Sequence, residues 1–188
     1  MGARAAAAQR TRESILDGGV RAFADRWYDE VTLADVAREA GVSQQTVVNH
    51  FGSKENLYLC GLNERFAPRV AAARSGVVIG DIASVVQTLV DDYEVTGTST
   101  IRVLALAERH PPLAEVTRNG RRYHRGWVAE VLAPRLAGGS AADRDRTVSL
   151  LTTALDVRTW YQLRHEEGRS VTETQQDLCR LVEALLER

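Results

Sequence analysis

The stretch Thr32–Phe51, TLADVAREAGVSQQTVVNHF, predicts two short helices joined by a tight turn. Thr32 is a typical N-cap residue, and Asp35 stands three positions later, where a carboxylate can bond back to the cap. Gly41 can enter the left-handed conformation that ends a helix, and Ser43 can cap the next one. A pair of short helices with glycine in the turn predicts a helix-turn-helix.

The second of these helices is polar but uncharged, with no Lys, Arg, Asp or Glu between Gly41 and Phe51. Amides and hydroxyls both donate to and accept from base edges, and Asn or Gln can pair bidentately with adenine. A carboxylate in this position would repel phosphate. The alternative is an ordinary solvent-exposed face with ordinary helix caps. The apolar set that would pack against a first helix at about 11–26 is Val36, Ala37, Ala40, Val42, Val47 and Phe51, which leaves Gln44, Gln45, Thr46, Asn49 and His50 outward.

Contacts to DNA phosphates are expected at helix starts, where backbone N–H groups and the helix dipole attract anions. Thr32, Ser43 and Ser53 each begin a predicted helix, and Lys54 follows the last of them. Residues 1–65 carry 8 basic and 9 acidic side chains, so nonspecific binding is expected to be weak. Arginines at positions 4, 10 and 12 could add a basic cluster on a flexible arm.

The whole chain predicts an all-α fold. It has 188 residues, 44% hydrophobic and 26% charged, with a net charge of −1, which excludes a disordered polyelectrolyte. Apolar residues recur at helical spacing, and about nine helices are expected. Breaks are expected at 76–80, 97–100, 111–112, 138–140 and 168, and the last two helices at 143–167 and 171–187. We expect an N-terminal arm at 1–9, a helix-turn-helix domain at 10–56, and a ligand-binding and dimerisation domain at 57–188, with a helix at 54–74 joining them.

The sequence lacks the motifs typical of membrane proteins, metal-binding proteins and several classes of enzyme. Cys60 and Cys179 are far apart, and no segment approaches the roughly 18 apolar residues of a membrane span, so a cytoplasmic protein is expected. The carboxylates of DDYE at 91–94 have no His at metal-ligand spacing, and no nucleophile elbow or phosphate-binding loop is present. We therefore expect no enzyme activity, no metal and no cofactor.

Residues 12–58, RESILDGGVRAFADRWYDEVTLADVAREAGVSQQTVVNHFGSKENLY, closely resemble the DNA-binding domain of the tetracycline-repressor (TetR) family of transcriptional regulators. AREAGVS, T-x-x-x-H-F and SKE at these separations carry the resemblance. It implies that Gln44, Gln45, Thr46, Asn49 and His50 face the groove, with Thr32, Ser43 and Lys54 near phosphates. Val48 replaces a Tyr that often contacts phosphate in the family. Trp27 replaces a Gly, so the exit from the first helix is expected to differ.

The later helices carry more apolar surface than one core face requires. The resemblance, which is weaker at 108–116 and 121–134, implies a homodimer and an effector pocket. The alternative is a single monomer core. The predicted dimer-interface residues are Leu151, Leu155, Leu178, Val182 and Leu185. The predicted pocket residues are Phe66, Leu89, Tyr93, Leu104, Tyr123, Trp127, Val131 and Trp160, with polar contacts from His124, Tyr93 or Arg122.

These patterns favour a dimeric transcriptional regulator, a repressor that leaves a palindromic double-stranded DNA operator when a small-molecule effector binds. One alternative is a small-molecule binding protein whose DNA-binding module is degenerate, which the near-neutral N-terminal charge would fit. The other is a helical enzyme, which would need a cluster of acid, base or metal groups in a central cavity.

Overall fold

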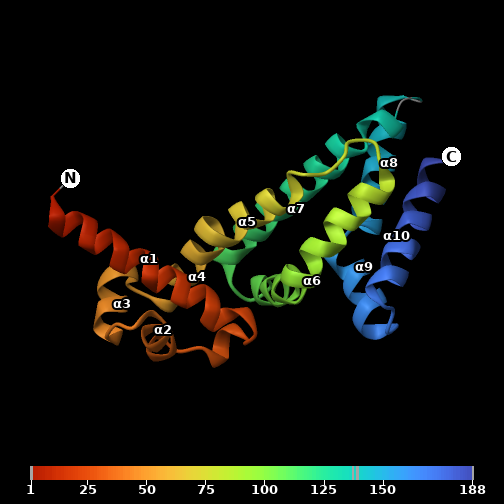
Figure 1. Cartoon of the computed structure of the whole chain (residues 1–188). Helices are drawn as coiled ribbons and strands as arrows, with labels where there is room; N and C mark the ends of the chain where they lie inside the picture. The colour runs from red at the N-terminus through yellow and green to blue at the C-terminus, as the bar shows by residue number, and fades with distance from the viewer. Residues whose placement is uncertain (1, 137, 139, 188) are drawn as a thin grey trace. The chain divides into compact units, whose positions relative to one another are not determined.

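The computed structural model describes residues 2–136, 138 and 140–187, and every regular element within them is helical (Figure 1). The predicted all-α fold is confirmed. The chain divides into two compact units. The first comprises the residues up to Arg69 together with Leu106–Val116, and the second comprises Val70–Ala105 together with the residues from Thr117 on.

The first unit is the predicted helix-turn-helix packed on a preceding helix. It contains α1 (Ala3–Ala24), a 3₁₀ turn (Tyr28–Glu30), α2 (Leu33–Ala40), α3 (Gln44–Phe51) and α4 (Lys54–Gly61). The apolar spacing of α2 and α3 buries Val36, Ala37, Val47 and Phe51 as expected, while Ala40 and Val42 are partly buried. The core of this unit consists of Ile15, Leu16, Ala22, Val31, Val36, Ala37, Val47, Phe51 and Leu57.

The predicted helix ends are confirmed. The hydroxyl of Thr32 accepts a hydrogen bond from the backbone N–H of Asp35 (3.1 Å), and the Asp35 carboxylate accepts one from the backbone N–H of Thr32 (2.9 Å). Gly41 has φ 69°, a conformation that is costly for a side chain bearing Cβ. Local capping therefore sets the angle between α2 and α3.

The start of α1 differs from what the sequence patterns suggested, whereas its exit follows the expectation. Residues 3–9 are helical rather than an arm. Five of the six residues in the run ARAAAA are alanine, which has the highest helix propensity of all residue types. Position 1 of the predicted arm lies outside the described residues. At the other end, Trp27 has φ −67° and extended backbone, so the helix exit needs no left-handed residue here, as expected from the substitution of Gly.

The predicted helix at 54–74 is present as three consecutive segments: α4, a π-helical turn (Leu62–Phe66) and α5 (Ala67–Arg74). The predicted boundary after residue 56 is not a boundary of packing. Leu57 is 1% exposed inside the core of the first unit, and that unit extends to Arg69. The assignment of separate functions to the two parts stays a prediction.

The second unit contains most of α6 (Ile82–Ala107) and α7 (Pro111–Val131), together with a 3₁₀ turn (Ala133–Arg135), α8 (Ala141–Ala154), α9 (Val157–Tyr161), a π turn (Gln162–Glu166) and α10 (Val171–Leu186). Helix α8 packs against α10. Valine and leucine side chains from α6, α7, α8 and α10 form one core around Trp127 and Trp160. No helix within the described residues has the length and apolar character needed to cross a bilayer.

Two predicted helix boundaries in this unit are wrong. Gly97–Thr100 lies inside α6 rather than between helices. A Cβ on Gly97 would lie 2.2 Å from Cζ3 of Trp160, so this glycine makes room for the indole ring. The predicted helix at 143–167 is interrupted after Ala154, because the Asp156 side chain accepts from the N–H of Arg158 and starts α9.

Candidate functional site

The polar face of α3 points to solvent as its spacing predicts. Gln44, Gln45 and Asn49 are exposed, while Val47 and Phe51 are buried on the opposite side. The remaining two residues of the predicted face, Thr46 and His50, are half-buried. An uncharged set of donors and acceptors therefore lies on one face of a helix that the core holds from behind. Their contact with bases stays a prediction.

Hydrogen bonds within α3 order this face. Gln45 Nε2 donates to Asn49 Oδ1 across one helical turn (2.9 Å). Ser43 Oγ accepts from the N–H of Thr46 (3.1 Å) and lies 2.8 Å from the Thr46 hydroxyl oxygen. These bonds hold the amide groups of Gln45 and Asn49 together, which lowers the entropic cost of presenting them as a pair.

The Lys54 ammonium group is engaged within the protein, and its predicted contact with phosphate stays a prediction. Its ammonium nitrogen donates to the carbonyl oxygens of Tyr28 and Val31, each at 2.9 Å. It also lies 4.2 Å from the centre of the Tyr28 ring. Two of its three N–H donors thus hold the segment before α2, because Tyr28 is the first residue of the 3₁₀ turn and Val31 is the residue that follows it. Lys54 is therefore a structural link in this conformation.

Several arginines of the first unit are also paired with carboxylates. Arg12 Nη2 lies 2.6 Å from a carboxylate oxygen of Glu64, and this hydrogen bond lowers the pKa of Glu64. Arg65 pairs with Asp17 at 2.7 Å. The expected basic cluster at 4, 10 and 12 thus loses Arg12, whose charge is already matched by a partner from a distant part of the chain.

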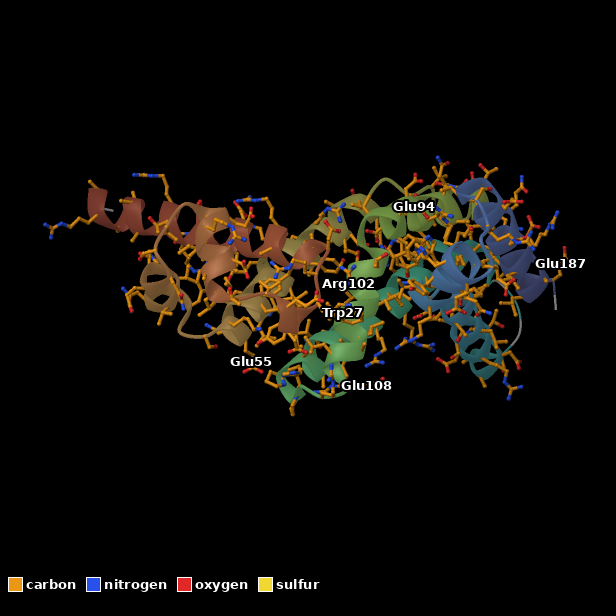
Figure 2. All side chains as sticks on the ribbon, turned by 90° about the horizontal axis from the view of Figure 1, so that it is seen from below. Trp27, Glu55, Glu94, Arg102, Glu108 and Glu187 are labelled. Atoms are coloured by element: carbon orange, nitrogen blue, oxygen red, sulfur yellow. The ribbon has the colours of Figure 1, made fainter. Side chains whose placement is uncertain are left out.

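The predicted pocket is filled by its own side chains. Leu104 is half-buried against the same core, whereas Tyr123 is 42% exposed and Phe66 belongs to the other unit. The indole N–H of Trp160 donates to Glu94 (2.8 Å), which is labelled in Figure 2 and also accepts from Arg164 (2.7 Å). The predicted pocket residues that lie fully inside the core are Leu89, Tyr93, Trp127, Val131 and Trp160.

An open space is found elsewhere in the second unit. A surface groove of about 330 Å³ lies between α6 and α10 and is lined mostly by polar side chains. None of the eight predicted pocket residues lines this groove, whose lining consists of Ala83, Gln87, Thr172, Gln175, Gln176, Cys179 and Arg180.

A buried polar cluster joins three helices within the second unit. Arg74 at the end of α5 donates through Nε to Asp92 Oδ2 of α6, and its Nη2 lies 2.9 Å from the same oxygen. Arg74 Nη1 lies 3.2 Å from His124 Nδ1 of α7. The Asp92 side chain is 1% exposed and that of Arg74 is 5% exposed. This ion pair is removed from water almost completely, so its charges depend on each other.

Aromatic rings surround the guanidinium group. The Arg74 Cζ atom lies 5.1 Å from the ring centre of Trp127, 5.6 Å from that of Tyr93 and 5.9 Å from that of Tyr123. These distances are within the range of cation–π attraction. Three rings and one carboxylate thus form an enclosure for a cation, defined here as the Arg74 cage.

His124 is neutral beside this cage. Burial, followed by the nearby Arg74 guanidinium, lowers the pKa of His124 to about 4. A guanidinium can only donate, so Nδ1 of His124 must be the acceptor and Nε2 must carry the proton. Trp127 Nε1 is buried without a hydrogen-bond partner, so it is a donor that an added acceptor could satisfy. His124 Nε2 lies on the other side of the ring from the Arg74 contact, and the backbone of Thr152 and Leu155 acts to raise the pKa of this ring.

The sequence patterns missed Arg74 and Asp92. Asp92 lies in the DDYE stretch, whose carboxylates were considered only as metal ligands and rejected for want of a His at metal-ligand spacing. His124 and Tyr93 were expected near a pocket and lie in the cluster, while Arg122 is exposed and donates to Asn119 (3.2 Å). No local signal connects Arg74 to Asp92, because they are on different helices.

Most of the predicted dimer-interface residues are core residues. Leu151, Leu155, Leu178 and Val182 are at most 1% exposed and pack within the second unit, so they cannot reach a second subunit in this conformation. Leu185 is half-buried against the same core. These residues thus belong to the core of a single chain, which was the alternative, because they lie on the inward side of α8 and α10. The exposed leucines of these helices are Leu150 (44%) and Leu181 (43%).

Comparison with known sequences places the helix-turn-helix in a family. Residues 15–59 match the family model for bacterial regulatory proteins of the tetR family. The chain is 40% identical over 65 residues to the HTH-type transcriptional regulator AlkX of Mycobacterium tuberculosis, covering 33% of this chain and 31% of that protein. It is 31% identical over 86 residues to the HTH-type transcriptional repressor AcnR of Corynebacterium glutamicum, covering 45% and 43%. The match thus spans less than half the length of these relatives.

Solved structures share the fold over nearly the whole chain. A transcriptional regulator from Rhodococcus sp. Rha1 has a TM-score of 0.75 at 19% identity, covering 94% of this chain and 96% of that one. A regulator from Saccharomonospora viridis, solved in complex with choline, has a TM-score of 0.70 at 21% identity, covering 93% and 96%. At these identities the likeness shows the fold alone.

Proposed function

We propose that this chain, whose residues 15–59 match the family model for bacterial regulatory proteins of the tetR family, is a member of that family and a sequence-specific DNA-binding transcriptional regulator. It acts in the cytoplasm as a repressor that a small-molecule effector releases from a palindromic operator. One observation carries the proposal. The exposed face of α3 presents Gln44, Gln45 and Asn49, without a carboxylate, on a helix fixed by a buried core.

The paired amides of Gln45 and Asn49 suit direct readout of bases. The Asn49 Oδ1 atom accepts from Gln45 and retains a second lone pair, while its amide N–H groups remain available. An amide with both a donor and an acceptor can pair with N7 and N6 of adenine. We therefore assign Asn49 to base recognition and Gln45 to its orientation.

We propose that the phosphates of the operator are contacted by backbone N–H groups more than by side chains. Lys54 and Arg12 are engaged within the protein, which leaves the N-terminus of α3 at Ser43 and the exposed Arg4 and Arg10 of α1. Backbone N–H groups at a helix start fix register without adding net charge. The expected salt dependence of binding is consequently shallow for a DNA-binding protein.

A palindromic operator requires two copies of the chain. We propose that a homodimer forms through the outward sides of α8 and α10, where Leu150 and Leu181 are exposed. A two-fold symmetric pair places the same apolar surface on both subunits. The two α3 helices must then lie roughly 34–36 Å apart to enter successive major grooves.

A small-molecule effector is supported by the kinship of fold with the choline-bound regulator. A second function is favoured by a different observation: residues 1–65 have no excess of positive charge, and several arginines are paired. That function is small-molecule binding by a protein whose helix-turn-helix has lost affinity for an operator.

Selection of operators from fragmented genomic DNA by the purified protein separates the two. Enrichment of one palindrome is expected for the wild type and not for the triple variant Gln44→Ala/Gln45→Ala/Asn49→Ala. The triple variant is a matched control because these three side chains are exposed and absent from the core. No enrichment by a folded, dimeric wild type would overturn the proposed regulator and leave the second function.

A further inference from the structure

The Arg74 cage combines two features that recognise organic cations. Three aromatic rings lie within 5.9 Å of the guanidinium carbon, and the buried Asp92 carboxylate supplies the opposite charge. Both features attract a quaternary ammonium or a guanidinium compound as readily as they attract Arg74. The side chain therefore stands where a small cation would bind.

We propose that the Arg74 cage is the effector site, that its effector is a small organic cation with a hydrogen-bond acceptor, and that this cation binds by displacing the Arg74 guanidinium. The proposal rests on the proposed function and names the chemical class of its effector. An anion fits less well, since Asp92 would repel it at the guanidinium.

An unpartnered donor specifies the second part of the effector. Trp127, one of the three rings of the cage, has a buried indole Nε1 that lacks an acceptor. A buried donor without a partner costs about 1–3 kcal/mol. A hydroxyl, carbonyl or carboxylate oxygen on the cation would relieve that cost, whereas the Arg74 side chain carries no acceptor and cannot do so.

The position of Arg74 makes displacement possible without opening the core. Arg74 is the last residue of α5, and it is the only buried residue among the described residues of that helix. The guanidinium group is thus what holds the end of α5 to the Asp92 carboxylate of α6. Its release into water frees this helix end, while the surrounding rings belong to α6 and α7 and remain in place.

Arg74 also acts as a tethered competitor. A site that one of the protein's own side chains occupies most of the time has a reduced affinity for an external ligand. The affinity is the intrinsic affinity multiplied by the fraction of time that the site is free. Removal of the side chain by Arg74→Ala should therefore strengthen cation binding, by about tenfold or more. A purely structural ion pair would show no cation binding in the wild type, whether or not the vacated site of Arg74→Ala binds a cation.

The test is calorimetric titration of full-length protein with choline and with methylguanidinium. The neutral control is 3,3-dimethylbutan-1-ol, which has the shape of choline without its charge. We expect saturable binding of at least one cation to the wild type, at least about tenfold weaker binding of the neutral alcohol, and tighter cation binding by Arg74→Ala. Asp92→Asn in the Arg74→Ala background should abolish the gain.

A folding control keeps the result interpretable. Arg74→Ala leaves a buried carboxylate without a partner and can therefore be less stable. The melting temperature of this variant is measured with and without cation. The control is the double variant Arg74→Met/Asp92→Asn, which lacks both charges. Cations should raise the melting temperature of Arg74→Ala and leave that of the double variant unchanged. The proposal is overturned if the wild type binds neither cation, if Asp92→Asn leaves the affinity unchanged, or if only Arg74→Ala binds.

DNA binding is measured separately with the selected operator. Cation binding without operator binding would contradict the proposed function while supporting the cage as a cation site. Operator binding without cation binding would do the opposite. The two failures are thus distinguishable.

Discussion

Two groups of polar side chains in this protein differ in almost every physical respect. The face of α3 is exposed, uncharged and built from residues one turn apart, such as Gln45 and Asn49. The Arg74 cage is buried, charged and built from three helices. Water competes with every hydrogen bond of the first group and with almost none of the second. The α3 face can thus change at little cost in stability, whereas loss of one charge of the cage leaves the other charge buried without its partner.

The largest effect is expected from breaking the buried ion pair. Asp92→Ala leaves the Arg74 guanidinium without its carboxylate and should lower the free energy of unfolding by about 3–5 kcal/mol. Asp91→Ala is the matched control, because Asp91 is the exposed neighbour on the same helix. Urea denaturation at one fixed protein concentration measures both. Equal stability of the two variants would show that the cage contributes no net stabilisation.

The next effect is a dependence of stability on pH through His124. Its folded pKa of about 4 lies below the ordinary 6.5, so between these values the unfolded chain binds a proton that the folded chain does not. Stability is therefore intact above pH 6.5 and falls as the pH drops to about 4, by about 3 kcal/mol. Arg74 and Asp156 also act on this ring, so the slope is compared in otherwise identical buffers.

His124→Gln does not titrate and should flatten the upper part of that curve, between pH 6.5 and 5. His110→Gln is the control, since His110 lies in the first unit against Tyr28. A curve of unchanged slope in His124→Gln would assign the pH dependence to other groups.

A smaller loss is expected at the link between α4 and the segment before α2. Lys54→Ala removes two charged hydrogen bonds to carbonyl oxygens and the contact with the Tyr28 ring, and should cost about 2–3 kcal/mol of folding stability. The slope of operator affinity with salt should stay nearly constant. Arg10→Ala should do the reverse, since Arg10 is exposed. A fall of about one unit in the slope of Lys54→Ala would restore a phosphate contact to Lys54.

The smallest effect on folding is expected on the α3 face. Asn49→Ala should leave stability within about 0.5 kcal/mol of the wild type, because the side chain is exposed. It should weaken binding to the preferred operator by about 1–3 kcal/mol and relax preference at one base pair. Competition binding across single-base operator variants measures this. A uniform loss on all variants would indicate that Asn49 contacts backbone phosphate instead.

The dimer surface shows how a correct pattern can be assigned to the wrong contact. The excess of apolar residues in this part of the chain was recognisable from the sequence, but Leu151 of α8 and Leu155 after it face the core, while Leu150 is exposed. Spacing fixes which residues share a face of a helix and leaves open which neighbour covers it. The packing of α8 on α10 decided the question. The predicted pocket residues divide in a similar way, since Trp160 fills the space against Gly97, whereas Tyr93, Tyr123 and Trp127 surround the Arg74 guanidinium.

The sequence by itself determined the helix-turn-helix and its polar face. Caps, left-handed glycine and apolar periodicity act between residues at most four positions apart, so Thr32, Gly41 and Ser43 carry their structural meaning locally. Tertiary structure alone decided the Arg74 cage and the role of Lys54. Arg74 lies 18 positions from Asp92 and 50 positions from His124 along the chain. Lys54 lies 26 positions from Tyr28. The partner that neutralises a buried charge is set by how helices pack, which no local pattern encodes.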